Sequence, residues 1–427
     1  MRLFIFTSMI PLLLLGQWER QSSGLPNDWH TGHAIDAADE NNVVISIHDN
    51  SISHVYKSQN GGNDWSECFS SDSISFIDIS IIDENHIWGC AWPAYIYSTT
   101  DGCSTWVRQF SDTTLTDFMN FIEMFDVNNG IAMGDGVLDS EGPAIFLKTT
   151  DGGLHWESVN DSAFGDHSAN VWRRIDFVSP DVGYFFESGS VPQYLFKTTN
   201  GGYNWTQTNY PDYARLIKFY DENIGLTIPR NDEIYRTIDG GESWEWIECT
   251  VGNPLDIEFS PDDPAKVWAA VGVQTYFSGD TGRTWAPQEM AHGYYRNSND
   301  IVFVNDSTGW VIKNGRVFYT SNGGGTLSID PKIIPHDFRL DQNYPNPFNP
   351  STQIPYALPN DANVSVTIYD VIGRQVRSLV QENKPAGYYT ALWNATNDLG
   401  FPVSTGVYIY SIQAGDYRAV KKMILMK

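Results

Sequence analysis

The sequence predicts an all-β protein, a seven-bladed β-propeller followed by a small Ig-like β-sandwich. Three observations support this prediction. A short turn motif recurs seven times at intervals of about 39 to 50 residues, which is the length of a four-stranded propeller blade. Apolar and polar residues alternate in short runs between Asp, Asn and Gly turns, as in strands and hairpins. The last ninety or so residues lack the turn and contain further alternating runs, which suit a small sandwich.

Each copy of the turn starts with Ser or Thr, has Asp or Asn two residues later, then Gly, and ends on Trp. The copies begin at Ser58, Thr99, Thr149, Thr198, Thr237, Ser278 and Thr320. Short hydroxyl and carboxylate side chains bond nearby backbone amides, and Gly adopts positive φ at no steric cost. We therefore expect structural turns between the outer strands of each blade. Their residues are Asn60, Asp101, Asp151, Asn200, Asp239, Asp280 and Asn322, with Trp65, Trp106, Trp156, Trp205, Trp244 and Trp285.

Two copies depart from the pattern. Cys103 replaces Gly in the second copy, and Leu327 stands where the seventh copy should have Trp. The N-terminal segment 18–21 reads Trp-Glu-Arg-Gln, much like the segment 106–109 that follows the second turn. We expect this segment to form the outermost strand of the last blade, with Trp18 in the missing place. Such closure removes the open edges of the ring.

The innermost strand of each blade carries an Ile, and the residue after this Ile is acidic in most copies. The acidic residues are Asp36, Asp78, Glu123, Asp176 and Glu258, whereas Lys218 and Val302 occupy the other two places. If this register faces the central channel, it forms a collar that attracts cations. The alternative is a set of solvated or hydrogen-bonded residues in the channel wall.

The loops between blades are a second candidate binding region, because loops vary while the scaffold stays rigid. Aromatic side chains with Arg and His are typical of interaction patches, although ordinary loop packing uses them too. The candidate rim residues are Arg173, Arg215, Tyr213, His292, Tyr295 and Arg296.

The N-terminus begins with Met1-Arg2 and an apolar run that ends before Gly16. We interpret residues 1–16 as a secretory signal peptide, because the run is too short to span a membrane; the alternative is a buried first strand. We expect the mature chain to contain no transmembrane segment. Export also permits disulfides, and four cysteines allow three complete pairings, among which the sequence does not decide.

The net charge of −26 is unevenly distributed. Residues 337–427 contain seven acidic and eight basic residues, so the remainder carries 45 acidic against 18 basic. Such a field repels nucleic acid and anionic membranes, although it also simply keeps a secreted surface soluble. We expect a monomer that binds no nucleic acid. Because there is no Cys-X-X-Cys or His-rich cluster, we also expect neither metal nor cofactor.

The repeated turn resembles the Asp-box, or BNR repeat, of sialidases, sortilin-type receptors and photosystem II assembly-factor propellers. The resemblance covers roughly residues 18–327. It implies a secreted or cell-surface scaffold that binds a protein or glycan. Sialidases carry an early Arg-Ile-Pro step and six blades, whereas here the nearest string, Thr227-Ile228-Pro229-Arg230, has the wrong order. We expect a non-catalytic protein; the alternative is an extracellular glycoside hydrolase or lyase that uses rim carboxylates.

The C-terminal module resembles the type A sorting domain of the type IX secretion system. The resemblance rests on Asn343-Tyr344-Pro345-Asn346-Pro347-Phe348-Asn349-Pro350, on Gly406-Val407-Tyr408 and on the closing segment 421–427. It implies export through that machinery to the surface or exterior of a Gram-negative cell; the alternative is an ordinary carbohydrate-binding or Ig-like module. We expect a propeller over 17–329, a linker over 330–336 and the sorting module over 337–427.

Overall fold

The computed structural model divides the chain into two compact units, Met1–Leu327 and Ser328–Lys427. It describes residues 18–26, 31–49, 51–137, 143–159, 174–187, 194–229, 233–248, 251, 254–272, 274–288, 298–313, 316–325, 338–343 and 345–426. All regular elements in these ranges are β-strands, which confirms the predicted all-β class. Within the same ranges, no helix is long and apolar enough to cross a membrane.

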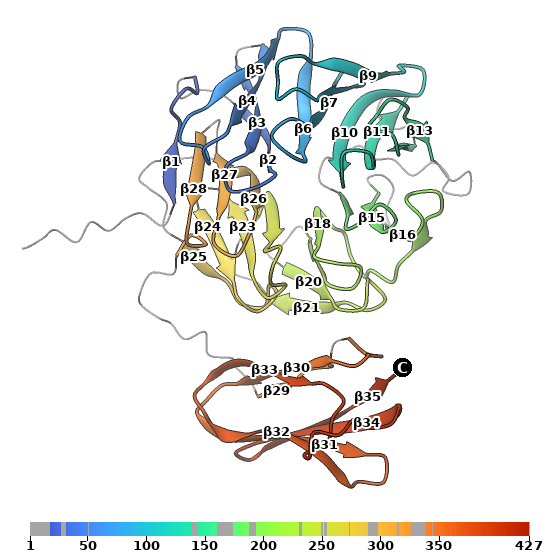
Figure 1. Ribbon diagram of the computed structural model, residues 1–427, viewed down its shortest axis with the longest axis vertical. Helices are drawn as coiled ribbons and strands as arrows, with labels where there is room; N and C mark the ends of the chain where they lie inside the picture. The colour runs from blue at the N-terminus through green and yellow to red at the C-terminus, as the bar shows by residue number, and fades with distance from the viewer. Residues whose placement is uncertain are drawn as a thin grey trace, which may run out of the picture. The chain divides into compact units, whose positions relative to one another are not determined.

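The first unit is a ring of seven four-stranded antiparallel sheets, which confirms the predicted seven-bladed propeller (Figure 1). The first strand of every blade lines the central cavity. Blades 1 to 3 are formed by β2 (Thr31–Ala37), β3 (Val43–Asp49), β4 (Ile52–Ser58) and β5 (Ser66–Ser71); β6 (Ser75–Ile81), β7 (Ile87–Trp92), β8 (Tyr95–Thr99) and β9 (Val107–Ser111); and β10 (Thr116–Met124), β11 (Gly130–Gly136), β12 (Ala144–Thr149) and β13 (Glu157–Ser158).

The remaining blades repeat this order, with one exception in the last. Blades 4 to 7 are formed by β14 (Ile175–Phe177), β15 (Gly183–Phe186), β16 (Leu195–Thr198) and β17 (Thr206–Gln207); β18 (Leu216–Phe219), β19 (Gly225–Ile228), β20 (Glu233–Thr237) and β21 (Glu245–Glu248); β22 (Asp256–Phe259), β23 (Val267–Val271), β24 (Gln274–Ser278) and β25 (Ala286–Gln288); and β26 (Ser298–Phe303), β27 (Gly309–Lys313), β28 (Arg316–Thr320) and β1 (Glu19–Gln21).

The exception closes the ring as the sequence predicts. Strand β1, from the N-terminal segment, pairs antiparallel with β28 as the outermost strand of blade 7. Trp18 is fully buried, and its indole meets the ring of Phe303 edge-on at 5.8 Å. A Cβ added to Gly324 in the seventh turn would come within 2.5 Å of the Trp18 Nε1 atom. Trp18 therefore lies against the turn that lacks its own Trp.

Within single blades, aromatic rings on the first strand cover glycines on the second strand. Gly183, Gly225 and Gly309 each begin a second strand, and a Cβ on any of them would come within 2.4 to 2.6 Å of a phenylalanine ring on the first strand. The close approach explains why these strands begin with Gly, since any larger side chain would displace the ring.

The second unit is a β-sandwich of a three-stranded and a four-stranded sheet. Its core includes the fully buried side chains of Ile354, Trp393 and Tyr410. The strands are β29 (Arg339–Leu340), β30 (Thr352–Leu358) and β33 (Gly387–Trp393), and β32 (Gln375–Lys384), β31 (Ala362–Asp370), β34 (Gly406–Ala414) and β35 (Tyr417–Leu425).

Strand β30 has Pro355 in its middle, although proline cannot donate a backbone hydrogen bond to a sheet. The structure accommodates Pro355 because β29 pairs with β30 only at Tyr356 and Ala357. The Pro355 carbonyl still accepts the amide of Asp341 at 2.9 Å. The residue therefore uses the one backbone hydrogen-bonding group that it has.

Candidate functional site

The seven repeated turns share one hydrogen-bond network. In the third copy the Thr149 hydroxyl donates to Asp151 at 3.0 Å and accepts the Gly153 amide at 2.8 Å, while the Asp151 carboxylate accepts the His155 amide at 2.9 Å. The first two of these bonds recur in every copy, and the third in each of the first six. The predicted residues Asn60, Asp101, Asp151, Asn200, Asp239, Asp280 and Asn322 thus bond the backbone or the hydroxyl of their own turn.

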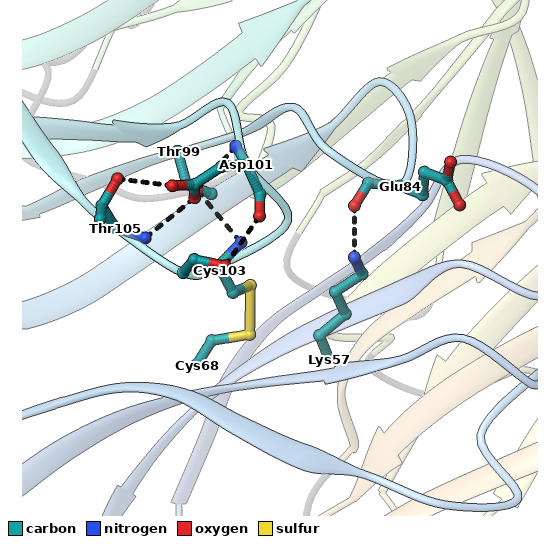
Figure 2. Close-up of a disulfide and its surroundings, with 8 residues drawn as sticks. Lys57, Cys68, Glu84, Thr99, Asp101, Cys103 and Thr105 are labelled. Atoms are coloured by element: carbon teal, nitrogen blue, oxygen red, sulfur yellow. Dashed lines mark hydrogen bonds between the residues drawn. A yellow bond between two sulfur atoms is a disulfide. The ribbon is translucent and has the colours of Figure 1, made fainter.

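The second turn is tied to blade 1 by a disulfide. Cys103, at the position that is Gly in the other copies, has a φ of 84° and bonds to Cys68 on β5 (Figure 2). Cys90 is buried and carries a free thiol, and Cys249 lies outside the described residues. Of the pairings that the sequence left open, the structure thus contains Cys68–Cys103.

Basic residues on the third strands reach the next blade. The Lys57 Nζ donates to the Glu84 carbonyl of blade 2 (Figure 2), and Lys148 donates to the Pro180 carbonyl of blade 4 at 3.0 Å. Lys197 likewise donates to the Glu222 carbonyl of blade 5 at 3.2 Å. The basic residue just before these turns therefore links neighbouring blades.

Tryptophans on the second strands link the blades at the same end. The indoles of Trp88, Trp268 and Trp310 donate to carbonyls in the turn of the following blade, at 3.2, 2.8 and 3.0 Å respectively. Each indole is almost completely buried. The turns are therefore fixed both within their own blade and by the preceding one.

A cavity of about 370 Å³ lies at the centre of the ring, and all five predicted collar residues line it. These are Asp36, Asp78, Glu123, Asp176 and Glu258. The lining also contains Asp256, Asp300 and Lys218. The cavity wall is thus rich in carboxylates and has a lysine among them.

Most of these carboxylates hold the next blade. Five aspartates accept a backbone amide from the first strand of the following blade, at 2.6 to 3.1 Å. The pairs are Asp36 with Ile81, Asp78 with Ile122, Asp176 with Phe219, Asp256 with Ile301, and Asp300 with Ile35. A buried amide without an acceptor is costly, so these aspartates join blades 1 and 2, 2 and 3, 4 and 5, 6 and 7, and 7 and 1.

Sequence reasoning missed Asp256 and Asp300, because they precede the inner-strand Ile rather than follow it. In blade 7 the register of β26 shifts between Ser298 and Asp300. Blade 1 has a comparable shift between Gly32 and Ala34. A bulge changes which side chain faces a given direction, but β22, which carries Asp256, pairs with β23 without a register shift. The position after the Ile thus does not identify every residue of the cavity wall.

Lys218 joins three blades at once. Its Nζ lies 3.0 Å from Glu258 of blade 6 and 3.6 Å from Asp176 of blade 4, while Lys218 itself belongs to blade 5. Burial works against the charge of Lys218, but the surrounding carboxylates, Glu258 first, raise its pKa well above the usual value. The lysine stays protonated and offsets part of the negative charge of the cavity.

Burial has the opposite consequence for the carboxyl groups. It raises the pKa of Asp36 to about 6, although the amides of Ile81 and Ala37 oppose the shift. It raises the pKa of Glu258 to about 7 against the attraction of Lys218. Burial, together with the neighbouring Asp176, raises the pKa of Glu123 well above its ordinary range. Among the described residues, no group of three or more His, Cys, Asp or Glu side chains is arranged to hold a metal ion.

Of the six predicted rim residues, Arg215 and Tyr213 are described. Arg215 donates to the Pro254 carbonyl at 3.1 Å. The Tyr213 hydroxyl accepts a hydrogen bond from Arg174, whose guanidinium also lies 4.7 Å from the Tyr213 ring centre. The other four, Arg173, His292, Tyr295 and Arg296, lie outside the described residues.

Arg174 was missed by sequence reasoning, which chose its neighbour. Its side chain is almost completely buried, and its Nη1 donates to the Glu187 carbonyl at 3.4 Å. The sequence Arg173-Arg174 gives no signal of which arginine packs inward, because the three residues of β14 that follow do not establish an alternating pattern.

Comparisons with known proteins agree with this two-part architecture. Residues 349–417 match the family described as FlgD Ig-like domain. The photosystem II assembly lipoprotein Ycf48 of Synechococcus sp. (strain CC9902) is 23% identical over 203 residues, which are 44% of this chain. The matching region spans 56% of the length of that relative.

Solved structures similar to this chain are propellers. One is described as YCF48 bound to D1 peptide, with a TM-score of 0.58 and 18% identity over 73% of this chain and 98% of that one. Another is the GH74 enzyme of Niastella koreensis, with a TM-score of 0.53 and 12% identity over 95% of this chain and 74% of that one. At these identities the likeness establishes the fold: a propeller of many blades, followed here by an Ig-like domain.

Proposed function

We propose that this chain is a non-catalytic binding protein whose propeller holds a partner protein or glycan at its rim. The observation that carries the proposal is the use of the cavity aspartates. Five of them accept backbone amides of the next blade, and Lys218 pairs with Glu258. Groups that hold the ring together in this way are poorly placed to transfer protons to a substrate, because their movement would break inter-blade bonds.

The comparisons support binding of a protein over other roles. Ycf48 is described as an assembly lipoprotein, and a structure of similar fold is described as bound to a peptide. The GH74 likeness supports the alternative of glycoside hydrolysis on fold alone, and folds host many functions. We therefore propose a protein as the partner and keep a glycan as the second candidate.

The repeated turn is, in this proposal, an Asp-box that builds the scaffold. The hydrogen bonds of the Asp or Asn at the centre of the described turns stay within the turn, and the Trp residues pack beside it. This supports a structural role for the motif rather than a sialidase-like site. The rim residues Arg173, Arg215, Tyr213, His292, Tyr295 and Arg296 remain the proposed binding residues.

The proposal extends to export. Residues 1–16 serve as a signal peptide, and residues 337–427 engage the type IX secretion machinery, which delivers the propeller of residues 17–329 to the surface or exterior of a Gram-negative cell. The motif Asn343-Tyr344-Pro345 and the closing basic segment support this assignment. Mass spectrometry of the exported protein tests it: we expect an N-terminus near residue 17 and loss of the C-terminal module. An exported form that still begins at Met1 and ends at Lys427 would contradict the assignment.

The binding function is tested with the full-length protein against an array of glycans and a panel of extracellular proteins, with reducing sugar release monitored in parallel. We expect a saturable partner and no turnover. Release of reducing sugar by the purified protein, kept in the exposed variant Trp246→Ala, would establish the hydrolase alternative and overturn the proposal.

A further inference from the structure

The upper ends of blades 1 to 3 expose an apolar row. We define the upper end of a blade as the end opposite the repeated turn, where the second and third strands meet. Ile52 follows the hairpin tip of blade 1, Trp92 precedes that of blade 2, and Val137 follows the second strand of blade 3. Their side chains are 42, 50 and 42% exposed. Three consecutive blades thus each present one large, partly exposed apolar side chain at the same end.

The hairpin tips beside two of these side chains have a strained backbone. Ser51 has a φ of 104° and Ala94 a φ of 105°, in a region that favours glycine. Ala94 is also completely buried, and its amide donates to the Ala91 carbonyl at 3.2 Å. Strained residues persist where the surrounding structure holds them, often at ligand-binding positions. The tip therefore presents Trp92 on a fixed backbone.

Negative charge surrounds the apolar row. Asp72 and Asp112 are exposed in the connections from blade 1 to 2 and from blade 2 to 3, and Asp117 is exposed at the start of β10. The described upper-end residues 47–49, 51–54, 69–76, 90–96, 109–120 and 134–137 include no Lys or Arg. Arg108 on β9 lies just outside these residues, with its guanidinium 5.1 Å from the ring centre of Tyr95.

The other half of the upper face differs in charge. Arg215 and Arg316, which are both partly exposed, lie at the upper ends of blades 5 and 7, whereas Arg174 and Lys313 at the upper ends of blades 4 and 7 are buried. Acidic residues such as Asp212 also occur there, so that half is mixed. Among the described residues, the upper ends of blades 1 to 3 combine exposed apolar side chains with carboxylates and contain no Lys or Arg.

We propose that the upper ends of blades 1 to 3 bind an extended, positively charged segment of a partner protein. Trp92 contacts the stem and charged head of a Lys or Arg side chain, because an exposed indole face attracts cations. Asp72 and Asp117 lie on either side and steer the segment through complementary charge. This inference rests on the proposed function, since it names the chemistry of the partner.

The test uses the full-length protein and a fluorescein-labelled synthetic peptide of alternating Lys and Ala, with an alternating Glu and Ala peptide as the control. Fluorescence anisotropy at low and near-physiological ionic strength gives Kd for each. We expect saturable binding of the Lys peptide, weakened by salt, and a Kd that rises about three- to ten-fold in Trp92→Ala. Asp72→Asn combined with Asp117→Asn should weaken binding further at low salt.

Trp246→Ala is the matched control, because Trp246 is 52% exposed on β21 of blade 5, away from the row. It should change Kd by less than about two-fold, as is usual for surface substitutions. Equal losses in both Trp variants, equal binding of the Glu peptide, or no saturable binding would each overturn the inference. If, instead, a partner from the protein panel binds and is released by Arg215→Ala but not by Trp92→Ala, the proposed function stands and this location is wrong.

Discussion

Two sets of carboxylates in the propeller both accept backbone amides, but in opposite surroundings. We call them the turn set, in the repeated turns, and the cavity set, in the wall of the central cavity. In the turns, Asp101 is exposed and Asp151 partly exposed, and hydrogen bonds from Thr105 and His155 lower their pKa values. In the cavity, burial raises the pKa values of Asp36 and Asp176 although both accept backbone amides. The first set fixes the conformation of a single turn, whereas the second joins neighbouring blades. The comparison shows that the repeat motif builds each blade, and that less regular residues assemble the ring.

We expect the largest loss of stability from a substitution that tests how β1 closes the ring. Trp18→Ala should lower the free energy of unfolding by about 3–5 kcal/mol, since it removes a fully buried indole and its 3.0 Å bond to Gln288. Urea unfolding followed by circular dichroism measures this loss. Trp92→Ala, at a half-exposed position, should lose less than about 1 kcal/mol. Equal losses would show that β1 does not close the ring.

The disulfide tests how far one turn depends on its neighbouring blade. Cys68 and Cys103 are 35 residues apart, so Cys68→Ser should cost about 4 kcal/mol through the entropy of the unfolded chain. With Cys68→Ser as background, Cys103→Gly should be more stable than Cys103→Ser by about 1 kcal/mol, because Gly accepts positive φ without strain. Thermal and urea unfolding of the two double variants measure the difference. The reverse order would mean that φ at this position carries no cost.

Two substitutions of Asp36 test the cavity set, because one removes both the charge and the hydrogen-bond acceptor and the other removes only the charge. Asp36→Ala leaves the buried Ile81 amide without its acceptor and should cost about 1–3 kcal/mol. Asp36→Asn keeps an acceptor oxygen and should cost clearly less in urea unfolding at neutral pH. If Asn and Ala are equally destabilising, the charge rather than the hydrogen bond joins blades 1 and 2.

Substitutions in the turn set should change the stability of the protein least. Asp101→Asn keeps the bond to the Thr105 amide and should leave the unfolding midpoint almost unchanged, as Asn60 and Asn200 already occupy this position in other copies. Asp101→Ala removes that bond and should lower the midpoint, but by less than Asp36→Ala, because solvent replaces an exposed acceptor. A larger loss than in Asp36→Ala would reverse the comparison.

The same contrast explains what the sequence could predict. The turn motif repeats at fixed positions because its hydrogen bonds are local, so the seven blades and the place of Trp18 followed from the residues alone. Asp256 and Asp300 could not be found in the same way, since their role depends on the backbone of the next blade, whose amides they accept. The pairing of Cys68 with Cys103 likewise depends on the approach of two blades.

The most direct test of the account is the pH dependence of the unfolding free energy. The pKa of Asp36 is about 6 in the folded state against 3.8 unfolded, and that of Glu258 about 7 against 4.5. The folded state therefore binds more protons in these windows, and stability should fall as pH rises from about 4 to 7. Burial lowers the pKa of Lys313 to about 7. Above that pH the folded state binds fewer protons than the unfolded state at this lysine, so Lys313 makes stability rise with pH only in that higher range.

We predict that wild-type stability increases by about 1–3 kcal/mol for each of these two groups as pH is lowered from 7.5 to 4.5. The double variant Asp36→Asn, Glu258→Gln should lose most of that slope. A wild-type stability that declines or stays level over this range, or a double variant with an unchanged slope, would contradict the claim that the carboxyl groups of Asp36 and Glu258 are buried between the blades in the folded ring.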